Sequence, residues 1–449
     1  MGLDGTTLED MCELVVDCPH STPTWTNEGI IVLRNQYIRD GILDLSDPSY
    51  TNEEDYQKRI KRAVPQAGDI VFTREAPMGE VCLIPEGLKC CLGQRQVLLR
   101  PKSTICGEYL FWALQSPYVQ HQISWNEGTG TTVSNVRIPV LKALKIPRRY
   151  EAEEDISRIL TILAQKISTN GNINHCLESM AQALFKSWFV DFDPVIDNAL
   201  AKGNPIPEEL QKKAAIRKAI REDATQSKLP EHIQKLFPNE FELSEEMGWV
   251  PKGWKSGTFA DIAEHIRNGV KVEAIGDDQF YVGLEHIGRK QLFLADSGLG
   301  ADVDSNKSGF VKQDLLFGKL RPYFHKVCIA PDDGICSTDI LVFRARKPIF
   351  QAYMYLCAYE DSFVEYANMR STGTRMPRAN AKDMLAYSIA IPGDQVLECF
   401  QNKIESGVAK GMHNIQESSQ LDKLRKILLP KLISGEIELS DSANTKEIA

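Results

Sequence analysis

The sequence lacks several features that mark common protein classes. None of its 11 cysteines stands at CxxC spacing from another, and the adjacent Cys90 and Cys91 cannot form a routine disulfide. No apolar stretch approaches the roughly 18 residues that span a bilayer, and the N-terminus has no basic region followed by a hydrophobic one. These absences argue against metal, disulfide-rich and membrane classes, and they favour buried thiols in a soluble, cytoplasmic protein.

Motifs of several enzyme classes are missing as well. There is no Walker A lysine loop, and no Asn or Asp is followed by the Pro-Pro-aromatic sequence that a standalone adenine methyltransferase needs. Asp191-Phe192-Asp193 resembles a paired carboxylate, but no His or Lys is arranged with it in the sequence. Scattered Asp and Lys leave a degenerate nuclease site open. The sequence therefore predicts a chain that is no enzyme and holds no cofactor or metal of its own.

Net basic charge is also absent. The chain has 61 Asp and Glu against 52 Lys and Arg, a formal net charge of -9. Taken alone, this balance disfavours a protein that binds a polyanion by itself, although local patches decide the matter better than the total.

What the sequence has instead is a large internal repeat. The first copy contains GDIVFTREAPMGEVCLI (68–84), EYLFWALQSPYV (108–119) and GTGTTVSNVRI (128–138). The second copy, about 245 residues further on, contains QDLLFGKLRPYFHKVCI (313–329), AYMYLCAYEDSFV (352–364) and STGTRMPRANAKDM (371–384). Each copy is long enough to be a domain, unlike a solenoid repeat. The first copy predicts short strands at 30–33, 70–73, 80–84 and 97–99 and a short helix at 109–114, hence an α+β fold.

A stripe of apolar residues at helical spacing follows each copy. The first begins at Ile156 and predicts about nine turns, roughly 50 Å of helix. The second runs from Val396 to Leu428, where Pro430 is expected to end it. Two such stripes in one chain most simply bury each other. The predicted fold is therefore α+β, with two similar domains separated by two long helices that form an antiparallel intramolecular coiled coil.

Composition and period divide the chain into six parts. They are a first domain at 1–150, a first long helix at 151–195, a polar linker at 196–250, a second domain at 251–392, a second long helix at 393–436 and a tail at 437–449. The linker includes a possible helix at 208–223 and offers no chemistry of its own.

Several motifs resemble the specificity subunit of type I restriction-modification systems. They are SMAQALFKSWFVDFDPV (179–195), LRKILLPKLISGEIEL (424–439), CPHSTPTW (18–25), LGQRQVLLRPK (92–102) and GWVPKGW (248–254). The resemblance covers essentially the whole chain, and the helix-end motifs are its most specific part. It implies a non-catalytic DNA-reading subunit, in which each of two target recognition domains reads one half of a split, asymmetric site.

The resemblance also implies partners. The paired helices would set the spacing and dock two methyltransferase subunits, with restriction and motor subunits joining outside. S-adenosylmethionine, ATP and Mg²⁺ would then be used by the other subunits of the complex.

Residues with guanidinium, amide, hydroxyl or ammonium groups, in the strand-turn segments and around the glycine loops, are the predicted DNA contacts. They are Arg74, Arg95, Thr129, Thr131, Thr132, Asn135, Arg137 and Lys142 in the first copy, and Lys319, Arg321, Arg370, Thr374, Arg375, Arg378 and Asn380 in the second. A basic cluster at 58–62 is a further candidate. Turn formation by Gly130 and Gly373, and a solvated basic face, remain alternative interpretations.

Apolar residues at the helix ends have two interpretations. Phe185, Trp188, Phe189, Leu428 and Leu432 are candidates for partner binding, and for the aromatic three the alternative is a place in the core. A second function also remains open: a bridging protein whose two domains bind proteins rather than DNA. The acidic net charge favours this alternative, and the family motifs oppose it.

Overall fold

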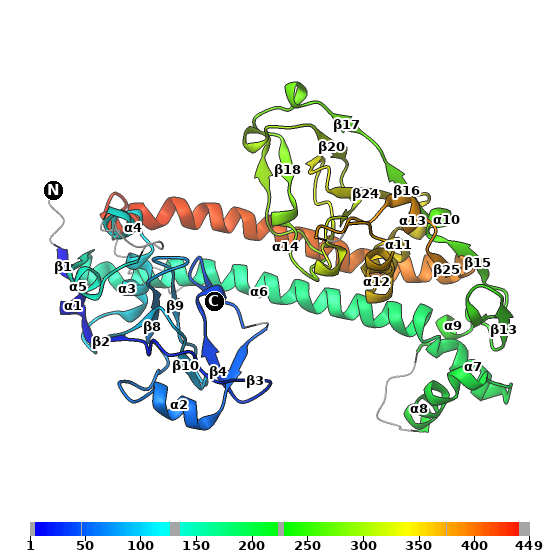
Figure 1. Ribbon diagram of the computed structural model, residues 1–449, viewed down its shortest axis with the longest axis horizontal. Coiled ribbons are helices and arrows are strands. Elements are labelled where there is room, and N and C mark those ends of the chain that lie inside the picture. Colours follow the sequence, from blue (N-terminus) through cyan, green and yellow to red (C-terminus); the bar gives the residue numbers. More distant parts are fainter. Residues whose placement is uncertain (1–4, 46, 126–134, 223–228, 374, 440–449) are drawn as a thin grey trace, which may run out of the picture. The chain divides into compact units, whose positions relative to one another are not determined.

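The structure is a computed structural model that describes residues 5–45, 47–125, 135–222, 229–373 and 375–439 (Figure 1). The chain forms two compact units, which are described separately. Unit 1 comprises Met1–Ile167 and Gln420–Ala449, and unit 2 comprises Ser168–Ser419. Helices and sheets are mixed in both units, as the sequence predicts.

Unit 1 is built around an antiparallel sheet in the order β2-β11-β8-β9, and a second sheet follows the order β10-β4-β7-β3. Helices α3 and α4 supply the other half of its main core, in which Tyr109, Leu110 and Trp112 are buried. The strands are β1 (Gly5–Thr7), β2 (Cys12–Asp17), β3 (Trp25–Thr26), β4 (Ile30–Leu33), β5 (Ile38–Arg39), β6 (Ile42–Leu43), β7 (Ser49–Thr51), β8 (Ile70–Thr73), β9 (Val81–Leu83), β10 (Cys90–Leu92), β11 (Gln96–Pro101) and β12 (Lys145–Pro147). The helices are α1 (Leu8–Met11), α2 (Glu53–Arg59), α3 (Gly107–Leu114), α4 (Pro117–Trp125) and α5 (Ile138–Ala143).

Unit 2 contains a matching antiparallel sheet in the order β16-β24-β21-β22, beside a five-stranded sheet in the order β17-β20-β23-β18-β19. Its strands include β15 (Lys255–Thr258), β16 (Ala263–Ile266), β17 (Gly269–Val270), β18 (Phe280–Val282), β19 (Gly298–Leu299), β20 (Lys307–Phe310), β21 (Leu315–Gly318), β22 (Val327–Ile329), β23 (Gly334–Cys336), β24 (Ile340–Ala345) and β25 (Ser388–Ile391). Its short helices include α10 (Phe259–Ile262), α11 (Gln351–Tyr359), α12 (Asp361–Met369) and α13 (Ala381–Leu385).

The strand registers show that the two units repeat one framework. In unit 1, β8 pairs antiparallel with β11 so that Ile70 lies opposite Leu99. In unit 2, β21 pairs with β24 in the same way, and Leu315 lies opposite Phe343. The sequence repeat is therefore a structural repeat, which confirms the predicted pair of similar domains.

A buried ion pair recurs at the same place in both copies. Asp69 accepts two hydrogen bonds from Arg100, at 2.8 and 2.7 Å, and Asp314 accepts two from Arg344, both at 2.7 Å. The Asp69 and Asp314 side chains are 3% and 1% exposed. Such a fork satisfies both carboxylate oxygens at once, so the carboxylate is tolerated inside the domain.

The two long helices are α6 (Glu153–Phe185) and α14 (Asp394–Ser434). In unit 1, Ile156 and Leu160 of α6 share a core with Leu432 and Ile433 of α14. In unit 2, Asn174, which follows Leu160 along α6, contacts Gly411 and Asn414, which precede Leu432 along α14. Within each unit the two segments thus lie side by side and antiparallel (Figure 1), which confirms the predicted helix pair.

A polar layer interrupts the apolar stripe of the helix pair in unit 2. The Asn174 side chain donates to the carbonyl oxygen of Gly411 at 3.1 Å and accepts from the Asn414 side chain at 2.8 Å. Asn170 donates to Glu417 at 2.8 Å. Buried amides of this kind fix the register of paired helices, because a slipped register leaves them unpaired.

The second helix lies within the predicted range 393–436, but Pro430 does not end it as expected. Helix α14 continues through Pro430 to Ser434. Proline lacks the N–H that the helix needs and costs about 3 kcal/mol or more in a helix interior. Burial of Leu429, Leu432 and Ile433 in the core of unit 1 offsets this cost.

The described part of the predicted linker is folded. It forms α7 (Asp193–Lys202), α8 (Gln211–Glu222), α9 (Glu231–Gln234) and a hairpin of β13 (Phe241–Ser244) and β14 (Gly248–Pro251). Val195, Ile233 and Val250 belong to the main core of unit 2. The polar composition hides these few apolar anchors, which explains why the sequence suggests a linker.

Glu178 fastens a loop of unit 2 to α6. Its carboxylate accepts hydrogen bonds from the backbone N–H groups of Leu292 and Phe293 at 2.8 and 2.9 Å. The Phe293 ring then lies where a side chain on Gly411 of α14 would be, since a Cβ there would stand 2.2 Å from the ring. Burial raises the pKa of Glu178 above its usual 4.5, although the two backbone hydrogen bonds oppose this shift.

This raised pKa predicts a pH-dependent stability. The folded state holds the Glu178 proton more tightly than the unfolded state, so wild-type stability falls as pH rises from 4.5 through the raised pKa. We expect Glu178→Gln to remove this contribution, so that the variant gains stability relative to the wild type across that window. Chemical denaturation of both proteins at a series of pH values measures the difference. Parallel stability profiles would contradict the assignment.

Candidate nucleic-acid interface

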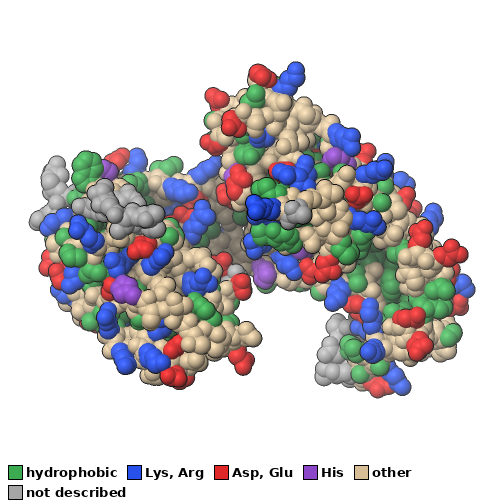
Figure 2. Space-filling model, viewed as in Figure 1, with side chains coloured by type: hydrophobic (Ala, Val, Ile, Leu, Met, Phe, Trp, Pro, Cys, Tyr) green, Lys and Arg blue, Asp and Glu red, His purple; other side chains and the backbone are tan. Residues whose placement is uncertain are grey.

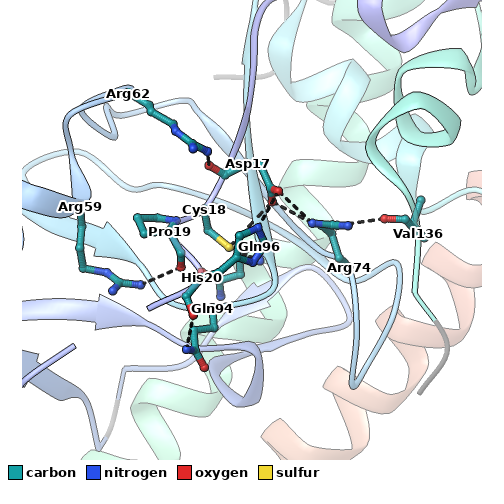
Figure 3. Close-up of polar contacts among 10 residues, drawn as sticks. All are labelled: Asp17, Cys18, Pro19, His20, Arg59, Arg62, Arg74, Gln94, Gln96 and Val136. Atoms are coloured by element: carbon teal, nitrogen blue, oxygen red, sulfur yellow. Dashed lines mark hydrogen bonds and ion pairs between the residues drawn. The ribbon is translucent and has the colours of Figure 1, made fainter. Parts of the chain in front are cut away.

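Arg74 occupies the central position of the predicted site in the first domain. Its guanidinium donates to both carboxylate oxygens of Asp17 at 2.9 and 3.0 Å and to the carbonyl oxygen of Val136 at 2.9 Å (Figure 3). The side chain is 14% exposed. These bonds tie the end of β8 to β2 and to Val136, so Arg74 holds three parts of the domain together.

The other predicted residues of the first domain surround Arg74. The Arg74 N–H donates to the carbonyl of Arg95 at 2.8 Å, and the Arg95 side chain is half-exposed and paired with Glu75 at 3.1 Å. Asn135 is half-buried and Arg137 is exposed, both beside Val136, whose N–H donates to Arg74. Lys142 lies further along, on α5, and pairs with Glu9 at 2.8 Å. Thr129, Thr131 and Thr132 lie outside the described residues.

The basic cluster at 58–62 contains one structural arginine. Arg59 is buried and donates to the carbonyl oxygens of Leu92 at 2.9 Å and Pro19 at 3.4 Å (Figure 3). Lys61 and Arg62 are exposed, and Arg62 donates to the Asp17 carbonyl at 3.3 Å. The cluster is therefore divided between scaffold and surface.

The second domain has a corresponding corner. The Lys319 N–H donates to the carbonyl of Asp339, as Arg74 does to Arg95, and the Ala379 N–H donates to Lys319, as Val136 does to Arg74. The Arg378 guanidinium forms an ion pair with the Asp339 carboxylate at 3.0 Å. The two copies thus place the same backbone scaffold around different charges.

The remaining predicted residues of the second domain flank this corner. The Arg321 N–H donates to the carbonyl of Pro377, and its guanidinium lies 5.9 Å from the ring centroid of Phe324. Arg370 and Arg375 are exposed. The Asn380 side chain accepts from the Lys382 N–H at 2.9 Å and caps α13. Thr374 lies outside the described residues.

Two exposed apolar residues near these loops are absent from the sequence prediction. Trp125 is the last residue of α4 and is 80% exposed, and Met369 is the last residue of α12 and is 75% exposed. The two helices are equivalent in the repeat, and each leads into a glycine loop. Alignment of the two copies could have identified both residues, because they occupy equivalent positions. Helical periodicity could not, because it gives no reason for an exposed apolar residue at a helix end.

The predicted partner surface at the end of α6 is corrected by the structure. Phe185, Trp188 and Phe189 are 3%, 1% and 6% exposed and belong to the main core of unit 2. The folded segment 193–251 and residue Phe400 enclose them, with ring centroids of Trp188 and Phe237 only 5.0 Å apart. Leu432 is buried in the core of unit 1, and Leu428 packs against that core.

Basic residues of α8, the helix expected at 208–223, form ion pairs with the Asp191-Phe192-Asp193 segment that the sequence did not predict. Lys213 lies 2.7 Å from Asp191, and Arg217 lies 3.8 Å from Asp193. Arg217 also pairs with Asp197. The two acids are therefore joined in an ion-pair network between neighbouring segments.

Charge and metal-ligand chemistry are dispersed over the described surface. Figure 2 shows acidic and basic side chains interspersed on the visible face of each unit. In the described ranges, no group of three or more His, Cys, Asp and Glu residues is placed to hold a metal ion. Among those same residues, no helix is both long and apolar enough to cross a membrane.

Comparison with known proteins gives consistent matches. Residues 5–179 match the family model of the type I restriction modification DNA specificity domain. The type I restriction enzyme HindI specificity subunit of Haemophilus influenzae is 26% identical, over 90% of this chain and 92% of its own length. The MjaIX specificity subunit of Methanocaldococcus jannaschii is 23% identical, over 83% of this chain and 78% of its own.

A solved structure agrees in fold. The crystal structure of the type I restriction-modification S subunit from M. genitalium matches with a TM-score of 0.51 at 14% identity and covers 98% of both chains. The family model matches the first copy and most of its helix, and the named relatives extend over most of the chain. Residues 5–179 thus match the type I restriction modification DNA specificity domain, and along most of its length the chain is similar to the specificity subunits of type I restriction-modification systems.

Proposed function

We propose that this chain is the non-catalytic, DNA-reading subunit of its complex, and that each domain reads one half of a bipartite, asymmetric site. The observation that carries this proposal is the repeated framework with altered corner residues. The position of Arg95 in the first copy is taken by Asp339 in the second. A retained scaffold with changed side chains presents different base contacts, which suits a site whose two halves differ.

The predicted contacts fall into two roles under this proposal. Exposed Arg95, Arg137, Arg370 and Arg375 are free to approach DNA. Arg74 and Arg378 are tied to carboxylates and fix the described segments that they contact. Trp125 and Met369 are exposed apolar residues that we add to the proposed surface.

The helix pair serves as the spacer in this proposal. Half-sites about one helical turn apart, roughly 34 to 36 Å, lie on one face of DNA. The polar layer of Asn170, Asn174 and Asn414 supports the spacer role, because it holds the helices in one register.

Two methyltransferase subunits are the proposed partners of the helices, with restriction and motor subunits joining them in the cytoplasm. The burial of Phe185, Trp188 and Phe189 moves the proposed docking surface to apolar side chains that are still exposed. Leu424 and Ile427 of α14 are 43% and 57% exposed, beside the half-buried Leu428. Exposed apolar side chains of this kind favour a protein partner.

A binding selection tests the proposed function. The chain is purified with its cognate methyltransferase subunits and mixed with a random duplex library, and the bound DNA is sequenced. We expect enrichment of one motif with two specified halves and an unspecified gap. A complex that is folded yet enriches no split motif would refute DNA reading and favour a protein-bridging role.

A further inference from the structure

A concavity in unit 1 concentrates side chains that recognise bases. It has a volume of about 350 Å³ and is formed by four separate stretches of chain. Its polar and aromatic lining consists of Trp25, Arg34, Asn35, Gln36, Gln94 and Arg95. All but Arg95 are absent from the contacts that the sequence predicts.

The backbone of this concavity is held in unusual conformations. Arg95 and Ala76, on two turns that line it, have φ of +65° and +42°. Residues other than glycine rarely adopt this left-handed region, and such conformations persist where the surroundings enforce them, often at functional sites. The Gly93 N–H donates to the carbonyl oxygen of Leu33 at 2.7 Å, and a Cβ on Gly93 would stand 2.2 Å from that oxygen. The shape of the concavity is therefore built into the fold.

The side chains that line the concavity are held in place by contacts around it. The Arg34 guanidinium lies over the Trp25 ring, 5.3 Å from the centroid, and donates to Ser49 at 3.3 Å. The Gln94 side-chain nitrogen donates to the carbonyl oxygen of His20 at 2.7 Å and to the Thr22 hydroxyl at 3.2 Å, so the amide oxygen is the group that Gln94 offers to a ligand. Arg95 is bound to Glu75 on one side only, and its side chain is 52% exposed. Ordered side chains of this kind lose little conformational freedom when they bind.

The chemistry of the lining favours base edges over phosphates. Guanidinium groups pair with two acceptors of guanine, and side-chain amides pair with the donor and acceptor of adenine. The lining has two arginines, one asparagine and two glutamines, with no lysine and no carboxylate. The nearest carboxylate that the lining residues bind is Glu75, which is paired with Arg95. In a chain with a net charge of -9, a lining without acids of its own is suited to an electron-rich ligand.

We infer that this concavity reads base edges of the first half-site, with Arg95 and Gln94 as the specificity-determining side chains and with Arg34 and Trp25 forming its wall. The inference rests on the proposed function and adds the place of base contact. Its counterpart in the second domain is changed, because Asp339 stands at the position of Arg95 and is paired with Arg378. The two domains accordingly read different bases.

Selection from a random duplex library by the assembled complex tests the inference. Arg95→Lys keeps the charge but loses the planar fork, and Gln94→Ala removes the amide. We expect each variant to relax the preference at one or two positions of the first half by about tenfold or more, which corresponds to loss of one bidentate base contact. The second half is expected to stay unchanged.

Arg39→Lys is the matched control, because the Arg39 side chain is 85% exposed and is no part of the concavity lining. It is expected to leave both halves unchanged. Thermal unfolding checks that every variant is folded, and Arg34→Lys provides a third variant if one of the others is not. Unchanged preferences in all folded variants, or weaker binding that is equal for every sequence, would overturn base reading here. A wild-type complex that enriches no split motif would instead overturn the proposed function itself.

Discussion

Arg100→Met is expected to lower the free energy of unfolding of unit 1 by about 3–5 kcal/mol, the typical result of removing one partner from a buried ion pair. The Asp69 side chain is only 3% exposed. In the variant its carboxylate loses both hydrogen bonds from Arg100 and keeps one, from the Gln66 N–H at 2.9 Å. Methionine retains most of the apolar volume, so lost packing contributes little. Chemical denaturation measures the loss, and hydrogen exchange of the β8 and β11 amides locates it in unit 1.

Two variants set the scale for this result. Lys58→Met breaks a surface ion pair with Glu54, whose side chains are 56% and 80% exposed, and is expected to cost well under about 1 kcal/mol. Arg344→Met removes the equivalent arginine of unit 2, which is 39% exposed against 17% for Arg100. We expect it to destabilise unit 2 by a smaller amount than Arg100→Met destabilises unit 1. Equal losses from Arg100→Met and Lys58→Met would show that the buried fork is not what stabilises the sheet.

Exchange of the first domain is expected to replace one half of the recognised sequence completely. A chimaera that carries residues 1–149 of a relative with another specificity keeps both long helices and the second domain. The structure adds a condition: Arg148 lies inside the exchanged segment and pairs with Glu153 outside it at 2.6 Å. The donor therefore needs an arginine at this position. Mapping of methylated sites in the chimaera and its two parents measures the outcome.

The reciprocal exchange is the control for the chimaera. Replacement of residues 251–392 by those of the same relative should change the other half-sequence and leave the first alone. A change in both halves after either exchange would contradict independent reading by the two domains.

The framework was predictable because local patterns determine it. Strands β4 and β8 have the predicted bounds, since compact runs of β-branched and apolar residues stand between turns. The helix pair was predictable because each long apolar stripe has to be covered by another apolar surface, and the two stripes can cover each other. The folded segment 193–251 was not, because its few apolar residues reach the core only after α7, α8 and α9 have formed.

The site was less predictable than the fold. The sequence identified Arg74 by its type and place, but its bonds to Asp17 join residues 57 positions apart and have no local signature. The same limit applies to the concavity, where Trp25, Arg34 and Gln94 come from separate turns. The spacing of the aromatic residues at the end of α6 fits either an interface or a core. Only the tertiary packing around them shows that they belong to the core.

Unit 1 is assembled from two stretches that lie far apart in the sequence, and this constrains how the protein folds during synthesis. Its main core contains Leu429, Leu432 and Ile433 beside residues that begin at Leu8, whereas unit 2 is one continuous segment. During synthesis Leu8 and its neighbours emerge long before these apolar partners, and they lack them until Ile433 has been made. Residues 168–419 have all their contacts available earlier, so the N-terminal domain stays open to chaperones and proteases for longer than unit 2.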